Sequence, residues 1–520
     1  MVMGMNNEPY MAMYDVRGIQ DYIFKTNYAK EIIGASYLVD SIIINGLREY
    51  IKTLEPGEQC RYMLDWEHDD ASAFQSHEEI LMQVMFIGGG NSYVLFRDKE
   101  TAHRVNRYLG RYILEHTYSL NLAVAMLKKG DSYAKDYQNI NKEMQRIKAK
   151  MPEVRPVGAL PFMDRDSITG FPLCKERKEH GEEHIYCTEA ALKRDAFLKR
   201  ETVYAEASGK KDNAEKIFDN MVTEKGENSS LAICHIDGNS MGIRIQKRMQ
   251  NIESYEEAIP VMREISMQIA KSFRETFDEM CVRMDELSPK IKQGVQLYRE
   301  LIVAGDDITF ICNAGLAIEA IQYFLQRISE KGYSACAGIS YFNSHFPFSD
   351  AYQVAEACCS SAKKRAKKPQ HRGTDGAIGC YLDFQICTNV RAAELSSYRD
   401  KHYLVDGEHI IARPYYVPSE MEGEDGKELN RKNEKNNIEH LKKWLKNFAN
   451  EKFIARNRAK KLRNTIPEGL REIEAYLFFL KSRDVRLENP KEQYRYWYDA
   501  LELLDIDLLG KEGGRDEVKN

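Results

Sequence analysis

Residues 301–312 read LIVAGDDITFIC, and this stretch is the clearest indication of the chain's architecture. Two apolar runs, 301–303 and 308–312, flank the residues AGDD, and Gly305 between them suits the tight turn of a hairpin. The pattern predicts two antiparallel strands. Their turn carries two adjacent carboxylates, Asp306 and Asp307.

A strand pattern that ends at Asp237 lies upstream of this hairpin, and a helical pattern from about Tyr255 to Leu287 connects the two. After the hairpin, periodicity predicts a helix, a strand, a helix and a strand over 314–331, 334–341, 349–367 and 377–384. This order matches the β-α-β-β-α-β pattern of ferredoxin-like domains and polymerase palms.

The same order occurs earlier in the chain. A strand pattern ends at Tyr14-Asp15, and the residues GGGN, 88–91, form the turn of a second hairpin. The flanking helices and strands are expected over 31–51, 80–87, 92–96, 99–116, 120–127 and 131–150. An internal duplication is the simplest interpretation. The expected fold class is α+β, with two ferredoxin-like polymerase/cyclase palm domains, a small insert and a C-terminal helical domain.

The expected organisation has five parts. They are a degenerate first palm domain, a small insert or linker domain, a second palm domain with the AGDD motif, a linker and a helical C-terminal domain, over 1–155, 156–228, 229–400, 401–432 and 433–520. The acidic loop from Glu420 to Glu428 is interpreted as a flexible linker.

Composition narrows the setting. The 520 residues are 30% charged with a formal net charge of -5, which neither requires nor excludes a nucleic-acid partner. Eleven scattered cysteines favour free thiols in a reducing compartment. No apolar stretch approaches membrane-spanning length, and Met1 to Tyr10 lacks the apolar run of a signal peptide. A soluble, cytoplasmic protein without a membrane partner is expected.

Three carboxylates from distant parts of the sequence should meet at one edge of the second sheet. A palm places the strand that ends at Asp237 beside the hairpin that carries Asp306 and Asp307. Hard oxygen ligands suit Mg²⁺ or Mn²⁺, and phosphoryl transfer needs such a cation to neutralise and align a nucleoside triphosphate. We therefore expect these three aspartates to be the metal ligands and the catalytic residues. The competing interpretation is that Gly-Asp is an ordinary turn sequence.

Further residues are expected to contact the nucleotide. Gly238, Asn239, Ser240 and Met241 follow Asp237 into a helix start, where free backbone N–H groups can hold phosphate oxygens. Gly305 lies in the turn itself. Lys363 on the helix 349–367 can place a cation on the triphosphate tail; the other interpretation of this lysine is a solvated helix face.

Five motifs extend the pattern: RGIQDYIF over 17–24, GGGNSY over 88–93, DGNSMG over 237–242, AGDD over 304–307 and AEACCSSAK over 355–363. They resemble S-G-I-Q-x-F-I-F, G-G-H-F-Y, D-x-D-x-[LM]-G, GGDD and A-E-x-x-L-x-x-A-K of the large polymerase-like subunit of type III CRISPR effector complexes. More distantly, they resemble GGDEF diguanylate cyclases. Asn239 stands in place of the family's second aspartate, and Ala304 in place of its first glycine.

The resemblance implies a nucleotidyltransferase or cyclase that makes a cyclic or linear oligonucleotide signal from nucleoside triphosphates, with ATP favoured, in antiviral defence. It implies that Gly89, Gly90 and Asn91 of the first palm help to hold a second nucleotide, and that RNA or other CRISPR-like subunits are partners. The alternative is a non-catalytic nucleotide- or RNA-binding scaffold subunit. Because no His-Asp nuclease domain precedes the first palm, a shortened or stand-alone relative without DNase activity is expected.

Two weaker patterns remain. Cys174, His180, His184 and Cys187 suggest zinc, but their spacing fits no standard finger, and a polar loop is favoured. Basic residues crowd 442–463 with interleaved aromatic residues, which permits RNA contact. Helical spacing favours buried aromatic side chains and solvated lysines there.

Overall fold

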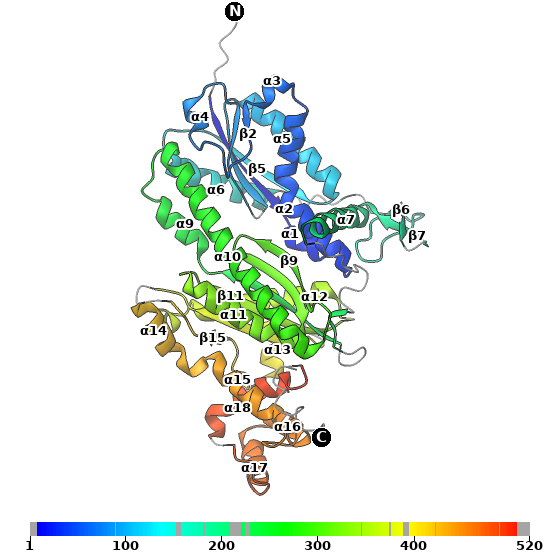
Figure 1. Ribbon diagram of the computed structural model, residues 1–520, viewed down its shortest axis with the longest axis vertical. Coiled ribbons are helices and arrows are strands. Elements are labelled where there is room, and N and C mark those ends of the chain that lie inside the picture. Colours follow the sequence, from blue (N-terminus) through cyan, green and yellow to red (C-terminus); the bar gives the residue numbers. More distant parts are fainter. Residues whose placement is uncertain are drawn as a thin grey trace, which may run out of the picture. The chain divides into compact units, whose positions relative to one another are not determined.

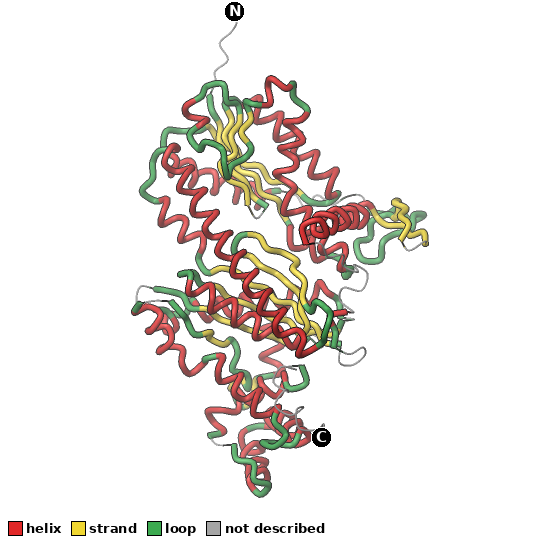
Figure 2. Tube along the Cα trace, viewed as in Figure 1, coloured by secondary structure: helices red, strands yellow, loops and turns green. Residues whose placement is uncertain are grey.

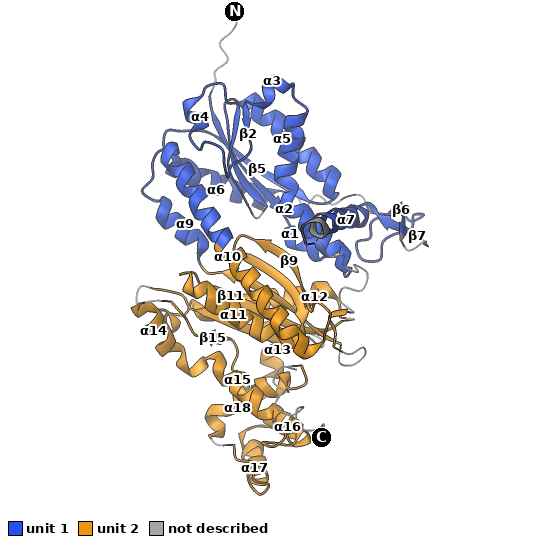
Figure 3. Ribbon diagram, viewed as in Figure 1, with its two compact units in different colours: residues 1–215, 240–271 blue, residues 216–239, 272–520 orange. Residues whose placement is uncertain are grey.

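The computed structural model describes residues 8–88, 90–151, 156, 158–179, 182–208, 220–223, 229–344, 346–373, 376–387, 395–421, 423–487 and 489–506. The chain forms two compact units (Figure 3): unit 1 contains Met1–Glu215 and Ser240–Lys271, and unit 2 contains Lys216–Asn239 and Ser272–Asn520. Each unit combines a sheet with helices (Figure 2), so the predicted α+β class is confirmed. No helix among the described residues is long and apolar enough to cross a membrane.

Unit 1 is built on a five-stranded sheet of order β2-β3-β4-β1-β5, with β2 Tyr62–Met63, β3 Met82–Gly88, β4 Asn91–Phe96, β1 Tyr10–Arg17 and β5 Asn121–Lys128. The strand β1 pairs antiparallel with both β4 and β5. Its apolar side chains are buried, because helices of unit 1 pack on it. The helices are α1 Ile19–Phe24, α2 Ala29–Lys52, α3 Pro56–Gln59, α4 Ala73–Ser76, α5 Lys99–Thr117 and α6 Tyr133–Lys150.

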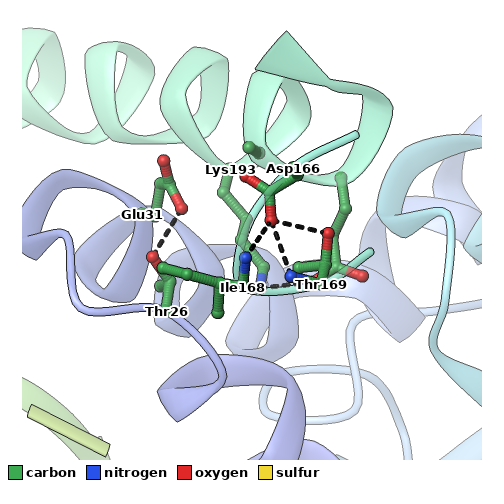
Figure 4. A pocket seen from close by; sticks show the side chains of 8 residues that line it. Thr26, Glu31, Asp166, Ile168, Thr169 and Lys193 are labelled. Atoms are coloured by element: carbon green, nitrogen blue, oxygen red, sulfur yellow. Dashed lines mark hydrogen bonds and ion pairs between the residues drawn. The ribbon is translucent and has the colours of Figure 1, made fainter. Parts of the chain in front are cut away.

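The insert of unit 1 is a hairpin followed by a helix: β6 Leu173–Glu179, β7 Glu182–Cys187 and α7 Thr188–Ser208. The helix α7 lies along α2, and the buried Lys193 Nζ donates to Glu189 Oε1 at 2.7 Å and to Tyr22 O at 2.6 Å. Lys193 lines a small cavity with a volume of about 10 Å³. Figure 4 shows the residues around it, with the hydrogen bond from Thr26 to Glu31. That volume suits about one water molecule, so this cavity is part of the packing.

Unit 2 is built on a six-stranded sheet of order β15-β12-β11-β8-β10-β9 (Figure 1), with β15 Tyr415–Val417, β12 Cys380–Ile386, β11 Ala335–Asn343, β8 Ser230–Gly238, β10 Asp307–Asn313 and β9 Tyr298–Ala304. The helix α12, Phe348–Ala366, packs on β11, β12 and β8. On the other face, Phe277 of α10 (Tyr255–Ile291) contacts Phe310 edge-on, and α11 (Ala317–Glu330) packs beside it. Because successive side chains of β10 point to opposite faces of the sheet, Phe310 lies on the face that α12 does not cover.

The two sheets repeat one topology. The order β3-β4-β1-β5 in unit 1 corresponds to β9-β10-β8-β11 in unit 2, in the same sequence order and with a hairpin in the middle. The helices α6 and α12 follow the equivalent strands β5 and β11. The duplication inferred from the sequence is therefore present in the backbone.

The C-terminal part is helical over its described residues, as expected: α15 Ile438–Ala449, α16 Arg456–Thr465, α17 Leu470–Lys481 and α18 Pro490–Leu503. Trp444 contacts the fully buried Trp497 edge-on at 5.5 Å between ring centroids, and Phe448 is also buried. The aromatic residues of the basic stretch 442–463 thus contribute to the core, which agrees with the interpretation from helical spacing.

The prediction of a flexible linker from Glu420 to Glu428 is wrong. Residues Glu424–Asn433 form α14, and the fully buried Leu429 packs in one cluster with Tyr381 and Tyr416. Acidic residues in the first turn of α14 suit the positive end of a helix, so their charge stabilises a helix here instead of a loop. The strand β15, also within the expected linker 401–432, pairs with β12.

Candidate functional site

The AGDD hairpin has the shortest turn that joins two antiparallel strands. Asp307 pairs with Ala304 across β10 and β9, which leaves Gly305 and Asp306 as the two central residues. Gly305 has φ +62°, and Asp306 does not have a positive φ. This is the pattern of a type II′ turn, in which the first central residue is glycine. The predicted hairpin is confirmed.

The strand β8 places Asp237 directly opposite Asp307 on the neighbouring strand β10. Side chains at opposite positions of an antiparallel pair have Cβ atoms about 5 Å apart and share one face of the sheet. The N–H of Gly238 donates to the carbonyl of Asp306 at 3.2 Å and ties the turn to the end of β8. The structure therefore brings Asp237, Asp306 and Asp307 to the same end of the sheet.

These carboxylates carry more negative charge than their protein surroundings neutralise. Burial, followed by the charges of Asp237 and Asp306, raises the pKa of Asp307 to about 7. Burial and then the charge of Asp237 also raise the pKa of Asp306. The buried Oδ1 atom of Asp307 has no hydrogen-bond partner among the described residues. The charges are close enough to disfavour one another, and a bound cation would relieve that repulsion.

The nearest ring nitrogen does not supply that charge. His235 Nδ1 lies 3.5 Å from Asp307 Oδ1, and it bonds instead to Thr309 Oγ1 at 3.0 Å. Burial lowers the pKa of His235, because a charged imidazole is poorly solvated there. His235 is therefore neutral near neutral pH and acts as a packing residue beneath the carboxylates.

Lys363 supplies the one close cation of the site that the described contacts show. Its Nζ forms an ion pair with Asp237 Oδ2 and donates to Gly238 O at 3.1 Å. The lysine comes from the last turns of α12, which brings it over the end of β8. Its side chain is 20% exposed, so it is not simply part of a solvated helix face. The structure places Lys363 on the predicted aspartate site.

Two backbone N–H groups of the predicted phosphate-binding segment 238–241 already have hydrogen-bond partners. Gly238 N donates to Asp306 O, and Asn239 N donates to Ser334 O at 2.8 Å. The prediction that these two N–H groups are free for phosphate is therefore wrong, because sheet and turn contacts already use them. Ser240 has a left-handed backbone, with φ +59°, and Met241 begins α9, Met241–Met249, whose first N–H groups have no partner within the helix.

Asn239, which stands in place of an aspartate in the resembled motif, is buried. Its Nδ2 donates to Gly379 O at 3.3 Å, while its Oδ1 has no hydrogen-bond partner among residues with described positions. The amide thus stabilises the connection to the segment before β12. An oxygen of this side chain remains available as a neutral ligand.

Unit 1 repeats the arrangement with two carboxylates fewer, because Gly90 and Asn91 occupy the positions of Asp306 and Asp307. Asp15 of β1 pairs with Asn91 of β4, and Val16 N donates to Gly90 O at 2.8 Å, as Gly238 N does to Asp306 O in unit 2. Lys148 Nζ contacts Asp15 Oδ2 at 2.5 Å. Gly90 has φ +80°, and Gly89 lies outside the described residues.

Lys148 was not identified from the sequence. The signal that reveals it is the duplication, because Lys148 on α6 occupies the position of Lys363 on α12 relative to the paired aspartate. Each unit thus joins an aspartate at the end of its central strand to a lysine at the end of an equivalent helix.

The number and type of donor groups at this site decide which metal ion it fits. Within the part of the chain that the structure describes, no group of three or more His, Cys, Asp or Glu side chains is placed to hold a metal ion. Mg²⁺ commonly takes only one or two protein carboxylates and completes its shell with phosphate and water oxygens. The paired Asp237 and Asp307, with the unpartnered Asp307 Oδ1, fit such a two-carboxylate site.

The two cysteines of the zinc pattern have different neighbours in the structure. Cys174 Sγ lies 3.3 Å from Thr188 Oγ1, whereas the buried Cys187 lies near Thr169 and the N–H of Ala190. His180 lies outside the described residues. All eleven cysteines are free, as expected.

Asp307→Asn is expected to change how stability depends on pH in the absence of metal. The folded protein holds a proton on Asp307 up to about pH 7, whereas the unfolded chain releases it near pH 4. Its stabilising effect is therefore complete below the unfolded pKa and is lost as the pH rises through the folded pKa. Asparagine is neutral throughout. Melting in EDTA should show the variant gaining on wild type between about pH 4 and about pH 7; a constant or shrinking difference would contradict the raised pKa.

No protein-family model and no curated protein matches this sequence. The fold matches solved structures of the Csm1-Csm4 cassette. The apo cassette matches at 12% identity and a TM-score of 0.49 over 97% of this chain and 70% of that chain. The cassette with cA4 matches at 11% identity and a TM-score of 0.46, over 96% and 70%. A third, described as a subcomplex of the type III-A CRISPR-Csm interference complex, matches at 12% and 0.46, over 97% and 70%.

Proposed function

We propose that unit 2 is a metal-dependent nucleotidyltransferase. A ribose hydroxyl attacks the α-phosphate of a nucleoside triphosphate, an O–P bond forms, and the bond to pyrophosphate breaks. The product is a cyclic or linear oligonucleotide signal in antiviral defence. The sequence motifs support ATP as the substrate, with RNA and other CRISPR-like subunits as partners. They also support a role of Gly89, Gly90 and Asn91 at a second nucleotide.

One observation carries the proposal: Asp237 and Asp307 face each other at the end of a sheet, and the carboxylate of Asp307 is incompletely partnered. Carboxylates in this arrangement are costly unless a cation neutralises them. Asp237 and Asp307 would hold Mg²⁺ or Mn²⁺, with Asp306 adjacent in the turn. When bound, the cation supplies charge neutralisation of the triphosphate.

The protein's own groups position the substrate. Lys363 pairs with Asp237 and has a flexible four-carbon stem. When another cation neutralises Asp237, the ammonium can turn to a phosphate oxygen. The turn leaves room for a ligand, because apart from Gly305 and its two chain neighbours no described atom lies within 4 Å of the place where a Cβ on Gly305 would stand. The hairpin and β8 fix the two carboxylates on a rigid sheet.

A second candidate, a non-catalytic scaffold that binds nucleotide or RNA, is favoured by the position of Asn239. Its amide is directed to Gly379 O, a structural contact, where the resembled motif has a second carboxylate. With fewer charges at the site, metal and triphosphate binding could persist without turnover. The two candidates differ in product formation.

Incubation of the protein with each of the four ribonucleoside triphosphates separates them. Reactions contain Mg²⁺ or Mn²⁺, with and without RNA, and mass spectrometry identifies the products. The proposal expects a new oligonucleotide and pyrophosphate in the presence of metal, and neither in EDTA. The absence of any product under all these conditions would support the scaffold.

Lys363→Met is expected to weaken binding of a non-hydrolysable ATP analogue by about tenfold to one hundredfold, the usual effect of losing one hydrogen bond to a charged group. Lys367→Met is the matched control, because Lys367 is exposed at the end of the same helix. Calorimetric titration in Mg²⁺ measures both. Unchanged affinity of Lys363→Met for the analogue would show that Lys363 pairs with Asp237 and does not contact the phosphates.

A further inference from the structure

We propose that a basic cleft along the outer side of α12 binds the phosphate backbone of a short oligonucleotide. The cleft has a volume of about 940 Å³ and lies within unit 2. Its walls come from α12, from α13 (Leu395–His402), from the segment 409–414 and from the start of α18. It is distinct from the aspartate site, since neither Lys363 nor any of the three aspartates lines it.

The charge of the lining is strongly positive, although the whole chain carries -5. Seven lysine and arginine side chains line the cleft against two carboxylates, Asp400 and Glu492; the seven are Lys364, Arg365, Lys368, Arg399, Arg413, Lys491 and Arg495. A concave surface with low-dielectric walls strengthens such a field and favours an anionic ligand.

Three of these cations are held by acidic partners and build the walls. Arg399 binds Asp383 through two nitrogens, at 2.8 and 2.9 Å, and Arg495 pairs with Glu408. Arg413 Nη1 contacts Asp499 Oδ1 at 3.1 Å. The other four, Lys364, Arg365, Lys368 and Lys491, form no ion pair within the described ranges. Their charge is available to a ligand.

The two guanidinium groups with unpartnered donors differ in their access to the cleft. Arg413 is fully buried and stacks over the ring of Phe384 at 4.4 Å, so its Nε and Nη2 atoms, which have no acceptor among the described residues, are closed to a ligand. The buried Nε of Arg365 also has none. Burial lowers the pKa of Arg365, as expected for a cation without a close carboxylate. Arg365 is only partly buried, so its guanidinium can reach a phosphate oxygen, the acceptor that guanidinium groups suit best.

The size and spread of the cations favour a chain of phosphates over one mononucleotide. A volume of about 940 Å³ lies near the upper end of the range for small-molecule sites. Lys364 lies in the last turn of α12 and Lys368 follows just after the end of that helix. Lys491 and Arg495 are four residues apart on α18, which is about 6 Å along the helix. Cations distributed along two helices can follow successive phosphates.

The test uses the full chain and a fluorescein-labelled single-stranded RNA of about ten nucleotides, a length within known site sizes. Fluorescence anisotropy is measured in EDTA, so that metal-dependent binding at the aspartates does not contribute. The cleft variant is Lys364→Glu with Lys368→Glu, both exposed side chains. The matched control is Lys443→Glu with Lys446→Glu, which makes the same charge change at exposed positions of α15 outside the cleft.

The cleft variant should bind at least about tenfold more weakly, and the slope of log Kd against log salt should fall by about 1.4 for two lost phosphate contacts. The control should bind as wild type. An equal or larger loss of affinity in the control would indicate that the RNA binds the basic stretch 442–463, and it would overturn the proposal. Absence of binding by wild type at low salt would also overturn it, as would full displacement of the RNA by an equimolar amount of ATP. A DNA strand of the same length distinguishes contacts to phosphate, which both strands share, from contacts to ribose.

Discussion

Replacing Asp306 and Asp307 together by alanine is expected to abolish nucleotide product formation and to leave the ligand-free melting temperature unchanged or raised. Asp307 lies opposite Asp237, and its raised pKa reflects burial and repulsion that alanine would remove. The turn should survive, because Gly305 supplies the positive φ and Asp306 does not need one. Loss of function with retained stability is the signature of a site in which charge is kept for a ligand.

Glu78→Ala with Glu79→Ala is a control for the double aspartate variant, since these two adjacent carboxylates also lie in a turn but are exposed. It should leave product formation unchanged. If Asp306 and Asp307 served the hairpin only, the double aspartate variant would melt earlier and still form product. That outcome would show that the two aspartates take no part in catalysis.

Gly338→Ala is expected to lower the free energy of unfolding by about 3 kcal/mol or more, at the upper end of overpacking effects. Gly338 lies on β11 opposite His235, under α12. A Cβ there would stand 1.9 Å from Ala355 O and 2.4 Å from Cys359 N, which are backbone atoms of the helix. Backbone cannot rotate away as a side chain can, so α12 and the sheet would have to separate. Lys363, on the same helix, would move from Asp237.

Urea unfolding measures this effect, with Gly110→Ala as the control. Gly110 lies on α5, and no described atom lies within 4 Å of its added Cβ. Alanine should therefore stabilise that helix by up to about 1 kcal/mol through its higher propensity. An unchanged urea midpoint for Gly338→Ala would mean that α12 does not approach β11 as closely as the structure shows.

The second palm's architecture could be predicted because its signals are local. The hairpin follows from two apolar runs around Gly305, and the position of Asp237 follows from a strand that must pair beside it. The prediction that the backbone N–H groups of Gly238 and Asn239 are free was wrong, because each of them bonds to a residue far away in the sequence. Their partners, Asp306 and Ser334, lie on other elements and could not be assigned from the sequence.

Other features depend on contacts that no local pattern reports. The acidic segment before Leu429 has the composition of a linker, but burial of that leucine against Tyr381 and Tyr416 makes it a helix. Lys193 would be expected in solvent, yet Glu189 and a backbone carbonyl stabilise its ammonium in the core. The basic cleft joins α12 to the start of α18, segments far apart in the chain.

The central claim is that Asp237, Asp306 and Asp307 form a metal-dependent triphosphate site, and calorimetry with a non-hydrolysable ATP analogue tests it most directly. Wild type and the Asp306→Ala, Asp307→Ala variant are each titrated in Mg²⁺ and in EDTA. The predicted result is binding by wild type in Mg²⁺, and no measurable binding by wild type in EDTA or by the variant in either buffer. Equal affinity of both proteins in Mg²⁺, with an earlier melting transition for the variant, would contradict the claim.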